Sequence, residues 1–189
     1  MPRSEPRAHR WDAILSRLPA DRALVGAEVG VWQGRLSERL LAARPRLRLY
    51  MVDRWLAPPP EDSYYASGAQ MARHPQRTFD LARMEAERRT APWVERRCIL
   101  HMDSVTAAGC VADGSLDFAF LDGDHSYDGV TRDLRAWAPK VRPGGLLCGH
   151  DYGRPDQGAV QAAVTAFLGP WAYRVERGEE WTWFYEVKA

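Results

Sequence analysis

The sequence predicts a doubly wound α/β fold, in which helices cover both faces of a mostly parallel, Rossmann-like sheet that ends in a C-terminal antiparallel hairpin. Two observations lead to this class. Five short apolar runs alternate mostly with helix-like segments between residues 23 and 152. Three of these runs are followed directly by an aspartate, and a fourth is followed after one glycine by His150 and Asp151. Because the carboxyl ends of neighbouring parallel strands share one crevice, we expect these polar side chains to meet there.

The first elements follow from apolar spacing. Residues 9–18 carry Trp11, Ile14, Leu15 and Leu18 at helical intervals before Pro19, which predicts a covering helix within residues 1–20. Residues 23–29 form a short apolar run that ends at a glycine, and residues 36–43 are good helix formers. Together these two segments read as strand, glycine turn and helix.

The next two strands are expected at residues 47–52 and 98–102, ending at Asp53 and Asp103. The interval 54–97 between them holds a triple proline and a charged helix from about residue 75 to 89. An interval of this length usually contains a lid or a binding loop. Its candidate acceptor-facing rings are Trp55, Tyr64, Tyr65 and His74.

The last two parallel strands are expected at residues 118–121 and 146–148, separated by a helix from near Asp128 and by an Arg-Pro-Gly-Gly turn at 142–145. The tail differs, because runs at 172–176 and 181–187 flank a turn and predict the edge hairpin. Large rings on both faces of the second run indicate a buried strand or a contact in a homodimer.

Length and composition restrict the class of protein. A chain of 189 residues with 46% hydrophobic content fits one domain spanning 1–189. The net charge of +1, with arginines spread along the chain, does not indicate a nucleic-acid surface. No signal peptide or membrane span is apparent. Cys98, Cys110 and Cys148 form no pairing pattern and suit buried, reduced thiols, so a cytoplasmic location is expected.

The first motif, EVGVWQG, places Glu28, Gly30 and Gly34 between a strand and a helix. Glycines there let the backbone approach a ligand closely. The spacing is not G-x-G-x-x-G, no P-loop lysine is present, and Glu28 disfavours a phosphate but attracts an amine. Asp53, at the end of the second strand, is placed to accept hydrogen bonds from a ribose diol. The combination favours a nucleoside that carries an amino acid.

The second motif joins LDGDHSYD to GHDY at adjacent strand ends. Asp122 and Asp151 offer the oxygen ligands that Mg²⁺ prefers, whereas the imidazole of His150 suits Mn²⁺, Fe²⁺ or Zn²⁺ better. His125 has the chemistry of a general base near neutral pH. The structural alternative is that His125 caps the helix near Asp128 or bonds a loop carbonyl.

The segments EVGVWQG, VDRW, LDGDHSYDGVTRDL and RPGGLLCGHDY resemble the small class I S-adenosylmethionine-dependent methyltransferases related to macrocin-type sugar O-methyltransferases. The resemblance covers residues 23–152 and implies a binding role for six residues. It implies that Glu28, Gly30 and Gly34 surround the methionine part of the cofactor. It also implies that Asp53 binds the ribose diol and that Asp103 and Ser104 hold the adenine amino group.

The same resemblance implies that Asp122 is a metal ligand and that His125, three residues later, is the general base. The family usually has two acidic or amide residues at the positions of His150 and Asp151, so this chain departs from the pattern at His150. Mg²⁺ is therefore expected as the metal, with Mn²⁺ or another cation as the alternative. Asp124 is placed to orient His125 or to serve the cofactor.

The expected activity is transfer of a methyl group from S-adenosylmethionine to a hydroxyl of a small molecule, such as a sugar or natural product, with help from a divalent metal. One alternative is a hydroxylase of the cephalosporin type, which resembles the same fold and strand ends. The other is a non-catalytic module that binds a nucleoside. The set of Asp122, His125 and Asp151 argues for chemistry over mere binding.

Overall fold

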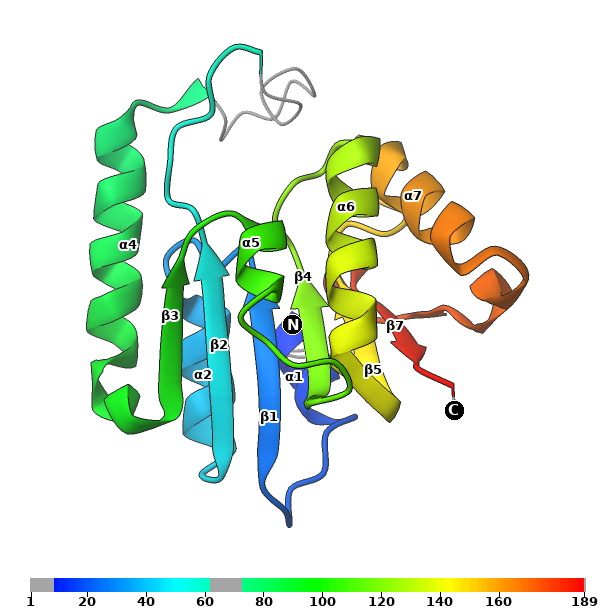
Figure 1. Cartoon of the computed structure of the whole chain (residues 1–189), viewed down its shortest axis with the longest axis horizontal. Helices are drawn as coiled ribbons and strands as arrows, with labels where there is room; N and C mark the ends of the chain where they lie inside the picture. Colours follow the sequence, from blue (N-terminus) through cyan, green and yellow to red (C-terminus); the bar gives the residue numbers. More distant parts are fainter. Residues whose placement is uncertain (1–8, 62–72, 189) are drawn as a thin grey trace, which may run out of the picture.

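The computed structural model describes residues 9–61 and 73–188. These residues form a seven-stranded sheet in the order β3-β2-β1-β4-β5-β7-β6 (Figure 1). The first five strands pair in parallel and the last two antiparallel, which confirms the predicted fold class. The strands are β1 Leu24–Val29, β2 Leu47–Asp53, β3 Arg97–His101, β4 Leu116–Leu121, β5 Val141–Gly149, β6 Glu176–Arg177 and β7 Trp183–Glu186.

Helices cover both faces of the sheet. In Figure 1, α5 and α6 lie in front of the strands, whereas α2 lies behind them. Each face has its own apolar cluster, one built with α5, α6 and α7 and the other with α1, α2 and α4. The helices are α1 Arg10–Leu15, α2 Arg35–Ala43, α4 Gln76–Thr90, α5 Ser104–Ala108, α6 Tyr127–Trp137 and α7 Gly158–Leu168, with short 3₁₀ turns η2 Ala91–Arg96, η3 Ala138–Lys140, η4 Gly169–Arg174 and η5 Glu179–Trp181.

Strand register brings the expected polar residues to one edge. Val29 pairs with both Val52 and Leu121, and Leu121 pairs with Gly149. The residues that follow these positions therefore leave the sheet at the same level. They are Gly30, Asp53, Asp122 and His150.

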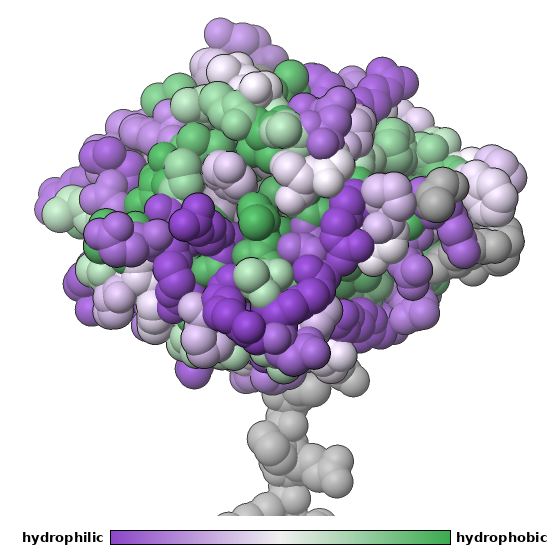
Figure 2. Space-filling model, turned by 60° about the horizontal axis from the view of Figure 1, so that its bottom comes forward, coloured by the Kyte–Doolittle hydropathy of each residue, from purple (hydrophilic) through white to green (hydrophobic). Residues whose placement is uncertain are grey.

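The opposite end of the sheet is built from paired charges. The carboxylate of Asp117 lies 2.7 Å from Arg22 and 2.9 Å from Arg142, and its other oxygen accepts the Val25 amide. Figure 2, which brings this end forward, shows hydrophilic and hydrophobic side chains interspersed. No helix among residues 9–61 and 73–188 combines the length and apolarity needed to cross a bilayer.

Three sequence expectations were wrong in detail. Residues 142–145 belong to β5 rather than to a separate turn, with Gly144 at φ 71° and a register shift against β4. The first hairpin strand is only Glu176–Arg177, because residues 172–174 lie in η4. Cys98 and Cys110 are exposed and only Cys148 is buried, since small and apolar neighbours in sequence do not determine which face of an element is covered.

Three aromatics of the predicted run 181–187 lie in a buried strand, whereas Trp181 lies in η5 and is 48% exposed. Trp183, Phe184 and Tyr185 are each less than a tenth exposed within this one chain, on both faces of β7. Pairing of β7 with β5 extends the apolar sheet, which explains rings on both sides. The predicted ring positions Tyr64 and Tyr65 lie outside the described residues.

Candidate active site

A cavity of about 440 Å³ opens at the carboxyl ends of the parallel strands. This volume is in the range of small-molecule sites. Six of the ten residues predicted for the site line it: Gly30, Asp53, Asp103, Ser104, Asp122 and the predicted base, His125.

Asp53 organises two loops at one side of the cavity. Its carboxylate oxygens accept the backbone N–H groups of Trp32 at 2.8 Å and Trp55 at 2.7 Å. Both tryptophans have left-handed backbone, with φ of 51° and 38°, so these bonds hold conformations that L residues rarely adopt. Enclosure by protein raises the pKa of Asp53, and the two amide bonds oppose the rise.

The glycine motif serves backbone packing as well as the cavity. A Cβ at Gly30, where φ is 90°, would lie 2.1 Å from the carbonyl oxygen of Asp122, so only glycine permits β1 and β4 to end side by side. Gly34 does not line the cavity. It begins α2 with φ 72°, and a Cβ there would lie 2.9 Å from the Cα of Ala86 in α4.

Glu28 also lies off the cavity. It is 3% exposed and hydrogen-bonded to the Ser37 hydroxyl of α2. Burial raises the pKa of Glu28 to about 8, although the bond from Ser37 lowers it. At neutral pH the Glu28 side chain is therefore mostly protonated. It largely lacks the negative charge that was expected to attract an amine.

Asp103 and Ser104 begin α5 at the other side of the cavity. Asp103 is exposed, and its carboxylate accepts the Thr106 amide at 2.9 Å as the N-cap. The Ser104 hydroxyl accepts the Trp137 indole N–H at 2.8 Å and hydrogen-bonds the carboxyl of Asp133. Both residues therefore have structural partners as well as cavity exposure.

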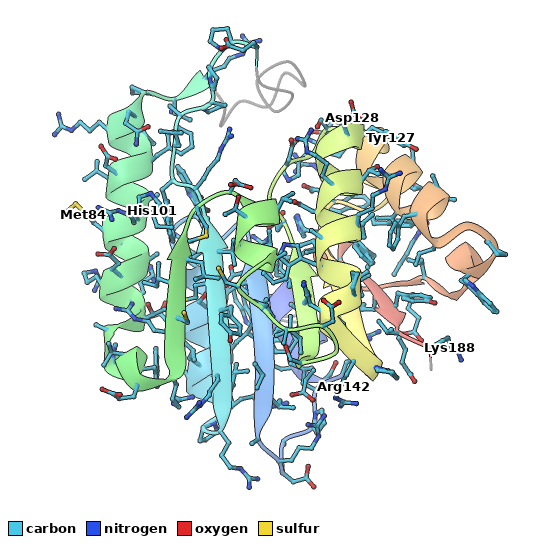
Figure 3. The ribbon with its side chains drawn as sticks, in the orientation of Figure 1. Met84, His101, Tyr127, Asp128, Arg142 and Lys188 are labelled. Atoms are coloured by element: carbon cyan, nitrogen blue, oxygen red, sulfur yellow. The ribbon has the colours of Figure 1, made fainter. Side chains whose placement is uncertain are left out.

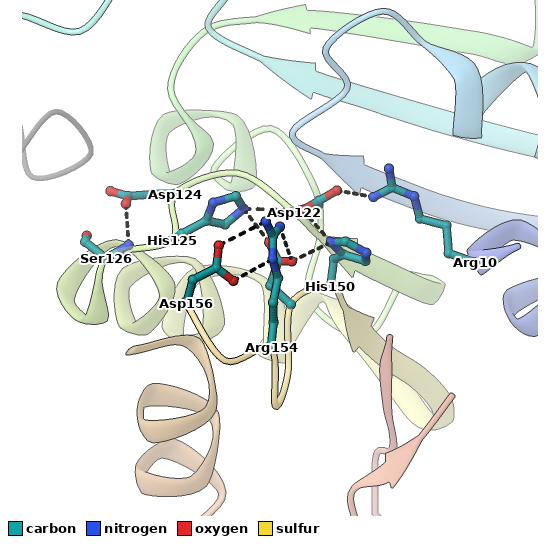
Figure 4. A network of polar contacts seen from close by, with 9 residues as sticks. Arg10, Asp122, Asp124, His125, Ser126, His150, Arg154 and Asp156 are labelled. Atoms are coloured by element: carbon teal, nitrogen blue, oxygen red, sulfur yellow. Dashed lines mark hydrogen bonds and ion pairs between the residues drawn. The ribbon is translucent and has the colours of Figure 1, made fainter. Parts of the chain in front are cut away.

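The reactive cluster joins the ends of β4 and β5 (Figure 4). One ligand atom from each of Asp122, His125 and Asp151 lies within 4.8 Å of the others. The His125 Nε2 atom is 3.1 Å from Asp151 and 3.5 Å from Asp122. The helix α6 is capped by Ser126, whose hydroxyl accepts the Gly129 amide, so His125 does not serve as the cap.

His150 approaches the same carboxylates from another side. Its Nδ1 atom is 3.1 Å from Asp151 and 3.6 Å from Asp122. His150 is absent from the lining of the main cavity and borders only a small adjoining pocket. The two imidazoles therefore differ, since only His125 faces the larger space.

Two arginines complete the charge balance. Arg10 of α1 donates to Asp122 at 2.5 Å, and Arg154 donates to Asp151 at 3.1 Å (Figure 4). The carboxylate of Glu180 accepts the backbone N–H of Arg10 and contacts the His9 ring at 3.1 Å, which ties α1 to the tail. The carboxylate pair is thus surrounded by two guanidinium groups and two imidazoles.

These contacts shift the titration of the cluster. Burial favours the uncharged forms of both Asp151 and His125, but contacts with groups of opposite charge outweigh this effect on their pKa values. Bonds and charges from His150, His125 and Arg154 lower the pKa of Asp151. The carboxylates, led by Asp122, raise the pKa of His125 above its ordinary value. The cluster therefore favours carboxylates beside protonated imidazole when no other cation is present.

Sequence reasoning missed Arg10, Arg154 and Asp133. No local pattern marks the two arginines, because their importance arises from contacts across the chain. Asp133 did carry a signal: it falls on the apolar helical stripe of Val130, Leu134 and Trp137, where an acid is unusual. It is 7% exposed and lines the cavity.

Comparison with known proteins defines the class. A family model described as a methyltransferase domain matches residues 27–152, two thirds of the chain, and the chain belongs to this family. It is a class I, S-adenosylmethionine-dependent methyltransferase, as the sequence resemblance implied. No curated protein sequence matches it.

Solved structures with this fold include several O-methyltransferases. NovP, an O-methyltransferase, is 22% identical with a TM-score of 0.59 over 94% of this chain and 76% of its own. CalS11, a calicheamicin methyltransferase, is 15% identical with a TM-score of 0.68 over 93% and 76%. A putative caffeoyl-CoA O-methyltransferase from Staphylococcus aureus is 12% identical with a TM-score of 0.64 over 95% and 84%. At these identities the likeness establishes the fold.

The cavity fits the cofactor that this class uses. S-adenosylmethionine needs acceptors for a ribose diol and an apolar slot for a flat base. Asp53 offers carboxylate oxygens to the cavity, and Met102 and Val105 contribute apolar lining. When bound, the cofactor supplies the electrophilic methyl group.

Proposed function

We propose that this protein methylates a hydroxyl oxygen of a small molecule, with His125 as the general base and a divalent cation beside the acceptor. The single observation that supports it is the placement of His125 on the wall of the cavity that also contains Asp53. A base and a cofactor-binding carboxylate thus face one space.

The carboxylates favour a protonated His125 in the absence of another cation, and a bound divalent cation would take over that positive charge. The neutral imidazole could then remove the hydroxyl proton. Asp151, 2% exposed at its side chain and 3.1 Å away, fixes the ring and stabilises the imidazolium that forms. Since Nε2 faces the carboxylates and keeps its proton there, Nδ1 would accept the hydroxyl proton. The alkoxide oxygen would then take the methyl group that bound S-adenosylmethionine supplies, with S-adenosylhomocysteine as the leaving group. Alignment of the reactants is the larger part of such catalysis, on the order of 7–11 kcal/mol in favourable cases.

The donor set also fits a divalent cation. Asp122 and Asp151 offer carboxylate oxygens, and His150 lies close enough to both to provide the nitrogen ligand while His125 remains a base. A bound cation would lower the pKa of the acceptor hydroxyl. The imidazole favours Mn²⁺ or Fe²⁺ over Mg²⁺. Arg10 bonds the Oδ2 atom of Asp122, whereas both imidazoles face Oδ1, so its charge would weaken a cation bound at the same carboxylate.

The acceptor is expected to be a sugar or a polyhydroxylated natural product in the cytoplasm. CalS11 is described as a TDP-rhamnose 3'-O-methyltransferase, which supports this chemistry for a chain of the same fold. The open cavity at the strand ends suits a small acceptor better than a macromolecule.

The test is a methyl-transfer assay with S-adenosylmethionine and a panel of sugars, nucleotide sugars and phenols, with and without Mn²⁺, Mg²⁺ and EDTA. Formation of S-adenosylhomocysteine together with an O-methylated product is expected. Cofactor binding without product across the panel would contradict the proposed acceptor class, and undiminished turnover in EDTA would contradict the cation.

A further inference from the structure

The tail of the chain holds the start of α1 close to the reactive cluster. One carboxylate oxygen of Glu180 accepts the backbone N–H of Arg10 at 3.2 Å, and the other lies 3.1 Å from Nδ1 of His9. The Arg10 side chain extends from there to Asp122, where it donates to Oδ2 at 2.5 Å (Figure 4). The proposed reaction gives no role to Glu180.

Glu180 lies in a strained corner of the tail. Glu180 and Trp181 both have left-handed backbone, with φ of 52° and 61°, a conformation that L residues rarely adopt. The Tyr152 amide donates to the Trp181 carbonyl at 2.9 Å. Tyr152 directly follows Asp151, so the corner is fixed to the turn that carries the second carboxylate of the cluster. Strain of this kind persists only where surrounding contacts enforce it, and it is frequent at functional sites.

The two ends of α1 have separate attachments. At the C-terminal end, Arg44 of α2 donates to the carbonyl oxygens of Leu15 at 2.5 Å and Leu18 at 3.1 Å. At the N-terminal end, the first N–H groups of a helix have no partner within it, and Glu180 satisfies one of them. Loss of Glu180 would therefore free the Arg10 end of α1 and leave the other end attached.

Arg10 places a positive charge where the proposed cation would bind. Its guanidinium lies against Asp122, the carboxylate that both imidazoles also approach. Like charges at this distance repel each other, and both partners of the ion pair are only partly exposed, so water screens the repulsion incompletely. A residue that keeps Arg10 in this place therefore lowers the affinity of the cluster for a cation.

We propose that Glu180 is a positioning residue, which keeps Arg10 on Asp122 and thereby makes the cation affinity of the cluster depend on the docked tail. This role rests on the proposed cation. The sign of its effect is distinctive. Removal of an acid near a cation site normally weakens cation binding, since an attractive charge is lost, whereas removal of Glu180 should strengthen it.

The experiment measures Mn²⁺ binding to the full chain by electron paramagnetic resonance, which needs no turnover. Glu180→Ala should tighten Mn²⁺ binding several-fold, in keeping with the modest worth of a partly exposed ion pair. Glu180→Gln keeps one acceptor for the Arg10 N–H, so it should tighten binding less, and it replaces the alanine variant if that variant does not fold. In the Arg10→Gln background, Glu180→Ala should cause no further tightening, because the guanidinium that Glu180 positions is already absent.

Two other acids provide matched controls. Glu176 lies 3.2 Å from Arg17 and so joins the tail to the residues beyond the other end of α1. Asp128 lies on the exposed first turn of α6 (Figure 3). Glu176→Ala and Asp128→Ala should leave Mn²⁺ binding unchanged or slightly weaker, as expected for the loss of a distant, screened negative charge.

The outcomes separate the role of Glu180 from the cation on which it rests. Unchanged or weaker Mn²⁺ binding by the folded Glu180 variant overturns the role of Glu180 and leaves the cation in place. Tightening that persists in full in the Arg10→Gln background overturns the route through Arg10. If neither the wild type nor Arg10→Gln binds Mn²⁺, the cation is wrong and the role of Glu180 falls with it.

Discussion

The two halves of the strand-end edge hold their acidic groups in opposite ways. At β1 and β2, Glu28 and Asp53 bond a hydroxyl and backbone amides, and burial raises the pKa of both. At β4 and β5, Asp122 and Asp151 are held by arginines and imidazoles, and the pKa of Asp151 is lowered. We call the first the neutral half, because its acids are bonded by neutral groups, and the second the charged half, because its acids are bonded by cationic groups.

Under the proposed function, this difference would let one sheet support binding and chemistry together. Acids bonded to backbone amides fix loop shape and remain as acceptors for neutral hydroxyls. Acids surrounded by cations keep their charge, so they can orient a base or hold a metal ion. The following predictions test whether the two halves are separable, beginning with the largest effect.

Loss of the charged half should remove turnover and spare cofactor binding. His125→Ala or Asp122→Asn is expected to lower kcat by about 10²–10⁴-fold, the range for general acid–base catalysis. Calorimetry should give an unchanged affinity for S-adenosylhomocysteine, with Asp128→Asn as the surface control. A variant whose cofactor affinity falls by as large a factor as its kcat would contradict the proposed separation of a binding half from a catalytic half.

Loss of the neutral half should weaken the cofactor first. Asp53→Ala removes the proposed acceptor for the ribose and leaves the amides of Trp32 and Trp55 without their bonds. We expect an affinity for S-adenosylmethionine about tenfold to a hundredfold lower, and a loss of about 1–3 kcal/mol in unfolding free energy. Asp53→Asn keeps one acceptor oxygen, so its cofactor affinity and its unfolding free energy should lie between those of the wild type and Asp53→Ala. Calorimetry and chemical denaturation measure these two quantities.

The pH dependence of stability tests whether Glu28 is uncharged in the folded protein. Its folded pKa of about 8 exceeds the unfolded value of 4.5, so the folded state holds the proton more tightly. Its contribution to stability is full below pH 4.5 and is lost as pH rises through about 8. Glu28→Gln should therefore match the wild type near pH 4.5 and exceed it by up to about 5 kcal/mol at pH 9 in urea unfolding, since each pKa unit corresponds to about 1.4 kcal/mol. Equal pH slopes for both proteins would refute the assignment.

The smallest expected effect is the change in Mn²⁺ affinity when Arg10, in the charged half, is replaced. Its guanidinium occupies Asp122, so it should compete with a divalent cation. Arg10→Gln is expected to tighten Mn²⁺ binding several-fold, in keeping with the modest worth of a partly exposed ion pair. Electron paramagnetic resonance of free Mn²⁺ measures this without turnover. His150→Ala should weaken the same binding, and a stronger loss in His125→Ala would make His125 a ligand instead of the base.

Local patterns predicted much of this molecule. Runs of apolar residues located the five parallel strands to within a few residues, since burial on both faces requires near-continuous apolar sequence. The strand-end rule brought Asp53, Asp122, His125 and Asp151 to one edge. The tail failed in part, because the turn of η4 and the short β6 depend on what packs against them.

The sequence by itself determined the alternation of strands and helices, the glycine that lets β1 end against β4, and the polar residues that follow each strand. Those features depend on neighbours along the chain and on the period of each element. Only the tertiary structure decided which acids keep their charge. It buried Glu28 against Ser37, enclosed Asp133 and carried Arg10 across 112 residues of chain to Asp122. Charge state depends on desolvation and on partners distant in sequence, and folding alone brings these together.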